Sequence, residues 1–154
     1  MLQINETATI AAPIERVFAA ASDPAEQLRW DKDTLRSVEP LTPGPLVAGA
    51  RYRGRFKGFG TVDYEFAEFD APRRFAHVAS MPMGRMTHRF TFRPLDGGTE
   101  ITQTGSLDPN LLGRLLSPVV RAMLGKRFRL IADELSRYTA TALPNVTRPP
   151  AGTG

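Results

Sequence analysis

Two histidines, His77 and His88, are the residues of this chain best suited to chemistry. Imidazole exchanges a proton near neutral pH, so a pair of histidines can serve one substrate as acid and base. The alternative is that each ring is a half-buried polar group that is hydrogen-bonded to a neighbour or to water. Two histidines do not make a zinc site without a third ligand, and the sequence does not fix the face of Glu68, the possible third. The chain has no cysteine, which excludes disulfides and cysteine zinc sites, and we predict neither a metal nor a cofactor.

Tyrosines, an amide and methionines accompany the histidines. Tyr52, Tyr64 and Gln103 are suited to orienting a carbonyl or hydroxyl of a ligand, although strand tyrosines also supply core area with one tip satisfied. Methionine fills irregular space and adapts to apolar ligands of varied shape. Three methionines cluster around one predicted hairpin: Met81, Met83 and Met86. They would contact a ligand; the alternatives are plain packing and an exposed tip that touches a membrane.

Residues 51–69 are predicted to form a β-hairpin that turns at residues 58–60. The first half alternates basic with apolar side chains, and the second half alternates acidic with apolar side chains. Since successive side chains of a strand point to opposite faces, opposite charges would meet on one face and aromatic rings on the other. The register that we expect pairs Tyr52 with Phe66.

Three further turn signals extend this sheet. They lie at residues 70–73, 82–83 and 96–97, and the last is an Asp-Gly pair typical of a two-residue hairpin. The resulting register sets His77 beside His88, and a one-residue slip in any hairpin would scramble the pattern. One face would then be aromatic with a few polar groups, and it would contain Tyr52, Phe66, His77, His88, Phe90 and Gln103. The opposite face would be basic and polar.

Helical segments are predicted at both ends of the chain. A first strand leads to a helix opened by Pro13, and Asp23 with Pro24 begins a second short helix; a weak strand follows over residues 35–41. Near the other end, Asp108-Pro109 and Ser117-Pro118 resemble caps, so we expect a short helix over 110–116 and a long one over 118–141. The apolar stripe of the long helix contains Leu124 and Phe128, and it should lie across the apolar face of the sheet.

Composition is that of an ordinary soluble domain. Hydrophobic residues make up 42% and charged residues 23% of the 154 residues, and the net charge is +4. No apolar run could span a membrane and the first residues do not resemble a signal peptide, so we expect a cytoplasmic protein without stable membrane insertion. No nucleic-acid motif is present. We expect one domain over residues 1–142 and a flexible tail over 143–154.

The order of these segments resembles the START-like, or SRPBCC, superfamily and its polyketide cyclase/dehydrase-like group. The resemblance rests on TIAAPIERVFAAASDP with the nearby Trp30, on EFDAPRRFAH, on TFRPLDGGTEIT and on the long terminal helix. It implies an α+β helix-grip fold, in which a curved antiparallel sheet of six or seven strands wraps a long C-terminal helix, with two short helices after strand 1. It also implies a deep cavity for hydrophobic ligands such as lipids, sterols, quinones and polyketides. The superfamily has no universal catalytic motif, so the resemblance assigns no catalytic residue.

These observations predict a protein that binds a small hydrophobic ligand (a lipid, a quinone or a polyketide-like molecule) between the sheet and the C-terminal helix. The alternative is a polyketide cyclase/dehydratase-like enzyme in which His77 and His88 are acid and base. A third possibility is a binding module that uses the basic face for a protein partner or for transient membrane contact. Trp30 would line the cavity mouth or anchor its helix; the sequence does not indicate an oligomeric state. The expected ligand-binding residues are Trp30, Tyr52, Phe56, Tyr64, Phe66, His77, Met81, Met86, His88, Phe90, Gln103, Leu124 and Phe128.

Overall fold

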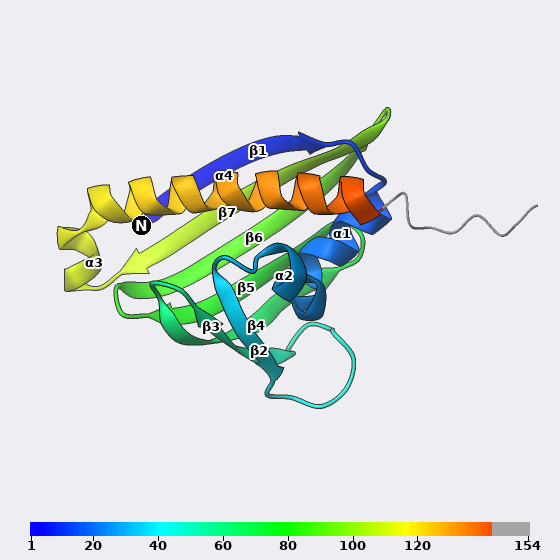
Figure 1. The fold of residues 1–154 in the computed structure, drawn as a ribbon. Helices are drawn as coiled ribbons and strands as arrows, with labels where there is room; N and C mark the ends of the chain where they lie inside the picture. The colour runs from blue at the N-terminus through cyan, green and yellow to red at the C-terminus, as the bar shows by residue number, and fades with distance from the viewer. Residues whose placement is uncertain (143–154) are drawn as a thin grey trace, which may run out of the picture.

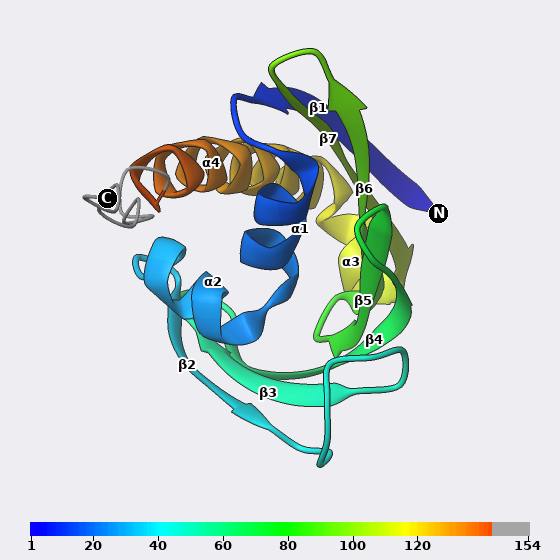
Figure 2. The same cartoon turned by 90° about the vertical axis from the view of Figure 1, so that its right-hand side faces the viewer.

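A curved antiparallel sheet and four helices make up the computed structural model, which describes residues 1–142 (Figure 1). The elements in chain order are β1 (Leu2–Ile10), α1 (Ile14–Ser22), α2 (Pro24–Trp30), β2 (Leu35–Pro40), β3 (Arg51–Phe56), β4 (Gly60–Asp70), β5 (Arg74–Met81), β6 (Gly84–Leu95), β7 (Gly98–Pro109), α3 (Leu111–Leu115) and α4 (Ser117–Ala142). The seven strands are ordered β1-β7-β6-β5-β4-β3-β2. The sheet curls around α1, α2 and α4 (Figure 2), which confirms the predicted helix-grip fold. The tail predicted over 143–154 lies outside the described residues.

The two short helices after β1 begin as their sequence signals indicate, with one difference. Asp23 caps α2, because its Oδ1 accepts a hydrogen bond from the backbone N–H of Ala25 at 2.9 Å. Pro13 stands just outside α1 as its N-cap, rather than within the first turn as predicted. The Trp30 indole is buried and donates to the backbone carbonyl of Ala20 at 2.8 Å, so the end of α2 is tied to α1.

The predicted register from β4 to β7 is confirmed. Phe66 pairs with His77 and His77 pairs with His88. The predicted β3–β4 pairing was wrong by two residues, because the turn is shorter than expected and Tyr52 faces Tyr64. The side-chain period of a strand is two residues, so this shift leaves every side chain on its predicted face.

The predicted helices at the C-terminal end are present, although the first cap was placed wrongly. Strand β7 continues through Pro109, so Asp108 is not a cap. Asn110 caps α3 instead, with its Oδ1 accepting from the backbone N–H of Gly113 at 3.0 Å. The long helix α4 lies over the concave face of the sheet and buries its apolar stripe there: Val120, Leu124, Phe128, Ile131 and Leu135.

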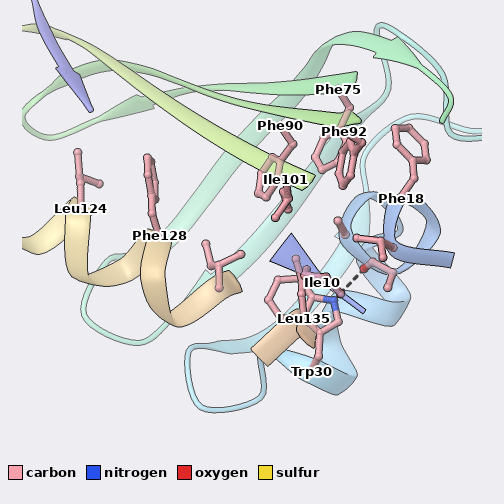
Figure 3. Packing of buried hydrophobic residues seen from close by; sticks show 14 of the residues in the cluster. Ile10, Phe18, Trp30, Phe75, Phe90, Phe92, Ile101, Leu124, Phe128 and Leu135 are labelled. Carbon is pink, nitrogen blue, oxygen red and sulfur yellow. Dashed lines mark hydrogen bonds between the residues drawn. The ribbon is translucent and has the colours of Figure 1, made fainter. Parts of the chain in front are cut away.

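Aromatic packing fills one end of the space between sheet and helices. Phe18 of α1 makes edge contacts with Phe69, Phe75 and Phe92, with ring centroids 5.2–5.7 Å apart. Figure 3 shows Phe18 close to Phe75 and Phe92, and Phe90 beside them. Packed aromatic rings bury large apolar areas and leave little free volume. The interior around Phe18 is therefore tightly packed core.

Candidate ligand pocket

An apolar pocket lies between the middle of the sheet and α4. The volume that the centre of a water-sized molecule can reach is about 140 Å³. The total atom-free space is about 870 Å³, which includes solvent at the open side. One water needs about 10–15 Å³ by the first measure, so the pocket has room for a small organic molecule. Its walls come from α1 and α2 (Ala21, Gln27, Trp30), β3, β4 and their turn (Phe56, Phe59, Val62, Tyr64), β5 and β6 (His77, Ala79, Met81, Met86, His88, Phe90) and α4 (Arg127, Phe128, Ile131).

Most of the residues expected to bind a ligand lie in these walls. The structure brings together Trp30, Phe56, Tyr64, His77, Met81, Met86, His88, Phe90 and Phe128. Four others lie outside the walls: Tyr52, Phe66, Gln103 and Leu124.

The four residues outside the walls have identifiable places. Phe66 is 0% exposed and belongs to the core, and Leu124 is buried one helical turn before Phe128. Tyr52 is half-buried and stacks on Tyr64 with ring centroids 6.0 Å apart. Gln103 is buried behind His88 and hydrogen-bonds to that ring, so it supports a wall residue without lining the pocket itself.

Sequence reasoning missed several wall residues, some of which carry a recognisable signal. Val62 and Ala79 share the inward face with Tyr64 and His77, so strand alternation alone would have found them. The other wall residues that sequence reasoning missed are Ala21, Gln27, Phe59, Arg127 and Ile131. Ile131 belongs to the apolar stripe of α4, whereas Arg127 gave no signal because a cation beside such a stripe normally faces solvent.

Gln103 fixes the orientation of His88. The amide Nε2 of Gln103 donates to the backbone carbonyl of Phe128 at 2.7 Å, which leaves Oε1 to face Nε2 of His88 at 3.1 Å. Since Oε1 can only accept, the His88 ring donates from Nε2 and its Nδ1 carries the lone pair. The ring is also stacked on Phe128, with centroids 4.2 Å apart. His88 is thus an oriented side chain of the pocket wall.

Tyr64 and His77 provide buried polar atoms without a partner. Within residues 1–142, neither the Tyr64 hydroxyl nor Nε2 of His77 has a hydrogen-bond partner, and their ring centroids are 4.9 Å apart. Burial raises the pKa of the Tyr64 hydroxyl, with a smaller contribution from Tyr52, so the hydroxyl stays neutral and able to donate. A buried polar atom without a partner costs about 1–3 kcal/mol of stability. Both residues line the pocket, so a ligand there can reach the side chains that carry these atoms.

Burial also determines the charge of the two histidines. It lowers the pKa of His77 to about 4. It likewise lowers the pKa of His88 to about 3, assisted by the neighbouring His77 and by Arg127 and opposed by the hydrogen bond to Gln103. Both rings are therefore neutral at pH 7. A general base works best with a pKa near the working pH, so these rings are better suited to hydrogen bonding than to proton transfer.

An ion pair joins Asp31, the residue that follows α2, to Arg127 in the pocket wall. Arg127 of α4 donates from Nη1 to Oδ1 of Asp31 at 2.8 Å and from Nη2 to Oδ2, while Gln27 donates to Oδ2 at 3.1 Å. The Asp31 side chain is only 2% exposed. A buried carboxylate needs such partners, because an unpaired charge in the interior is strongly destabilising. Arg127 thus contributes to the wall a charge that is already neutralised.

The possible third metal ligand lies on the other side of the sheet. Glu68 accepts from Arg74 and Arg89 on the convex face, far from the concave face that carries the histidines. Over residues 1–142 no group of three His, Cys, Asp or Glu side chains could hold a metal ion. Within the same residues, no helix is long and apolar enough to cross a membrane.

A curved antiparallel sheet, a long terminal helix and an apolar pocket between them define a helix-grip protein. Residues 1–140 match the family described as polyketide cyclase / dehydrase and lipid transport, and the chain belongs to this family. No curated protein matches the chain in sequence.

Solved structures share this fold at low sequence identity. TTHA0849 from Thermus thermophilus is 22% identical with a TM-score of 0.73, over 92% of this chain and 99% of the other. CalU16 from Micromonospora echinospora is 16% identical with a TM-score of 0.65, over 92% and 78%. DynU16, a protein in the dynemicin biosynthetic locus, is 18% identical with a TM-score of 0.71 over 91% of this chain. The match covers 48% of DynU16, so this chain spans about half the length of that protein.

Proposed function

We propose that this protein binds a small, mostly apolar molecule with at least one oxygen atom, and that it holds or carries this molecule rather than transforming it. The observation that carries the proposal is the pair of unpartnered polar atoms, the Tyr64 hydroxyl and Nε2 of His77, on side chains of an otherwise apolar pocket. Ligand pockets typically combine apolar walls with a few such groups that fix orientation. A carbonyl or phenolic oxygen would satisfy the Tyr64 hydroxyl.

The remaining walls favour a flat or flexible apolar body. Phe56, Phe90 and Phe128 supply aromatic surface, and Met81 and Met86 adapt to varied shapes. Arg127 is committed to Asp31, so the proposal does not require a charged ligand. Quinones, aromatic polyketide-like molecules and lipids with a carbonyl near the apolar part meet these conditions. The family description, which names polyketides and lipid transport, supports the second and third of these classes.

The enzymatic alternative rests on the pairing of His77 with His88, which lie opposite each other on β5 and β6. It requires one ring to accept a proton and the other to donate one. Their lowered pKa values leave both rings neutral and weakly basic at pH 7, which supports binding over catalysis. His→Phe variants that lose turnover of a polyketide-like substrate while retaining its binding would reverse this preference.

The only tryptophan allows a direct test of binding. Trp30 lines the pocket, so quenching of its fluorescence should report a bound quinone or polyketide-like probe. Titration with a naphthoquinone, an anthraquinone and a fatty acid, together with native mass spectrometry, should give a saturable one-to-one complex for at least one of these probes. A probe that binds the wild type and, by native mass spectrometry, binds equally well to a Phe128→Trp variant, which enlarges a wall residue, would contradict the proposed site. The absence of any complex would contradict the proposed function.

A further inference from the structure

Exposed apolar side chains are concentrated on one short segment of the surface. Leu111, Leu115 and Val119 are 74%, 71% and 65% exposed. Leu112 and Leu116 of the same segment are also exposed, whereas the remaining exposed large apolar side chains within residues 1–142 lie elsewhere: Met1, Leu28, Val47 and Leu130. A contiguous exposed apolar area marks an interaction surface, whereas isolated exposed leucines need no explanation. We call this area the α3 patch and define it by its residues: Leu111, Leu112, Leu115, Leu116 and Val119.

The α3 patch is a fixed surface rather than a loose loop. Asn110 caps α3 and also donates from its side-chain amide to the carbonyl of Pro82 at 2.8 Å. Gly113 is buried and faces the carbonyl of Met83 so closely that a side chain there would collide with it. These contacts hold α3 against the β5–β6 turn and leave its leucines on the outside. Figure 1 places α3 at one end of the molecule, beside that turn.

Positive charge accompanies the α3 patch, and the nearest carboxylate before it in sequence is Asp108. Arg114 and Arg121 are exposed, and no Asp or Glu occurs between residues 109 and 132. The convex face of the sheet is different, because its arginines alternate with acids. There Arg53 pairs with Asp63 and Arg93 pairs with Glu100. The basic strand face, which the sequence left open as an alternative site for transient membrane contact, is therefore partly neutralised, whereas within residues 1–142 neither Arg114 nor Arg121 forms an ion pair.

We propose that the α3 patch docks on an anionic lipid membrane surface. Exposed leucines next to arginines match the boundary between acyl chains and anionic headgroups, where apolar burial and charge attraction act together. A second copy of this chain is a poorer occupant. A two-fold contact centred on the patch would bring the exposed Arg114 side chains of the two copies close together, which like-charge repulsion disfavours.

The position of the α3 patch relates membrane docking to the pocket. The β5–β6 turn that contacts α3 begins at Met81, which lines the pocket. A membrane under α3 would therefore lie next to one end of the pocket. The docking itself goes beyond the proposed ligand binding and does not depend on it, because it uses none of the buried polar atoms.

Sedimentation with vesicles tests the docking. Wild-type protein should bind vesicles of equimolar phosphatidylcholine and phosphatidylserine, more weakly at high salt and more weakly still to phosphatidylcholine alone. The Leu111→Gln/Leu115→Gln variant should bind at least tenfold less. Arg114→Gln/Arg121→Gln should lose about fivefold per arginine at low salt. All of these side chains are exposed, so the variants should melt as the wild type does.

Two matched controls separate the α3 patch from general stickiness and net charge. Val47→Gln removes an exposed apolar side chain from a distant loop, and Arg51→Gln/Arg55→Gln removes equal charge from the convex face. Neither should change vesicle binding by more than twofold. The proposal is overturned if the wild type does not bind anionic vesicles, or if the controls weaken binding as much as the patch variants. A dimer in sedimentation equilibrium that Leu115→Gln dissociates would show that a second copy covers the patch.

Discussion

Replacing Tyr64 by Phe should stabilise the ligand-free protein. The substitution removes one oxygen atom that is buried without a partner, while the ring keeps its contacts with Tyr52 and His77. Because the hydroxyl loses its hydrogen bonds with water on folding and gains none in return, its removal should relieve about 1–3 kcal/mol. For a protein of this size, 1 kcal/mol corresponds to about 2–4 °C in Tm. We therefore expect Tyr64→Phe to melt about 2–12 °C higher than the wild type.

The same substitution should weaken ligand binding. A bound carbonyl or phenol would accept from the Tyr64 hydroxyl, and loss of such a bond costs about 1 kcal/mol, or about fivefold in Kd. Opposite signs for the free protein and the complex are the signature of a polar group kept for a ligand. A structural tyrosine would lose stability in both states.

Thermal melts and Trp30 fluorescence titrations measure both effects on the same samples. Tyr52→Phe is the matched control, because Tyr52 stacks on Tyr64 but is half-buried and lies outside the pocket walls. It should change neither Tm nor Kd appreciably. A Tm for Tyr64→Phe below that of the wild type would refute the reasoning, since it would mean that the hydroxyl is bonded in the free protein.

Three further predictions concern the walls of the pocket. Gln103→Leu should lower stability by about 1–3 kcal/mol, because it frees the Phe128 carbonyl and the His88 ring from a buried partner; chemical denaturation measures this, and an unchanged midpoint would contradict the proposed network. Arg127→Met should cost about 3–5 kcal/mol by leaving the Asp31 carboxylate buried and unpaired, and Asp31→Asn in the same chain should recover much of the loss. Stability should fall as the pH drops from 6.5 toward 4, because the unfolded chain binds protons that the buried His77 and His88 do not accept until pH reaches about 4 and about 3. Above pH 6.5 both states have neutral histidines and this dependence disappears; His77→Phe should reduce the slope between pH 4 and 6.5 in urea melts relative to the wild type.

The register of β5 to β7 could be predicted because turn signals fix the length of each connection. The predicted pairing of Phe66 with His77 holds because a bulge between Phe66 and Glu68 offsets a β4–β5 turn that is one residue longer than expected. The Asp96-Gly97 pair allows only a two-residue turn, so every partner across β6 and β7 follows from it. The β3–β4 turn contains Gly58 and Gly60, both with positive φ, and glycine accepts several turn geometries there. The two-residue error followed from that freedom.

The division between core and pocket could not be predicted. Phe66 and Tyr64 lie on the same face of the same strand, yet one is core and the other lines the pocket. The difference arises because Phe18 of α1 fills one end of the concave face, and strand alternation does not report where a helix will pack. The Asp31–Arg127 pair joins residues 96 positions apart, a separation over which a single sequence carries no pairing signal.

The hydrogen bond from Gln103 to the Phe128 carbonyl restricts how a ligand can enter. Sliding α4 by one residue would displace that carbonyl by about 1.5 Å and rotate it by about 100°, which breaks the bond. The adjacent residue, Arg127, is held to α2, so the same turn of α4 is anchored both to the sheet and to a second helix. The helix therefore stays fixed over the sheet, and a ligand exchanges through the open side of the pocket, with any further widening coming from the β3–β4 turn around Phe59 and the β5–β6 turn beyond Met81. Amide hydrogen exchange should then be slowest in the middle of α4 and fastest at these two turns.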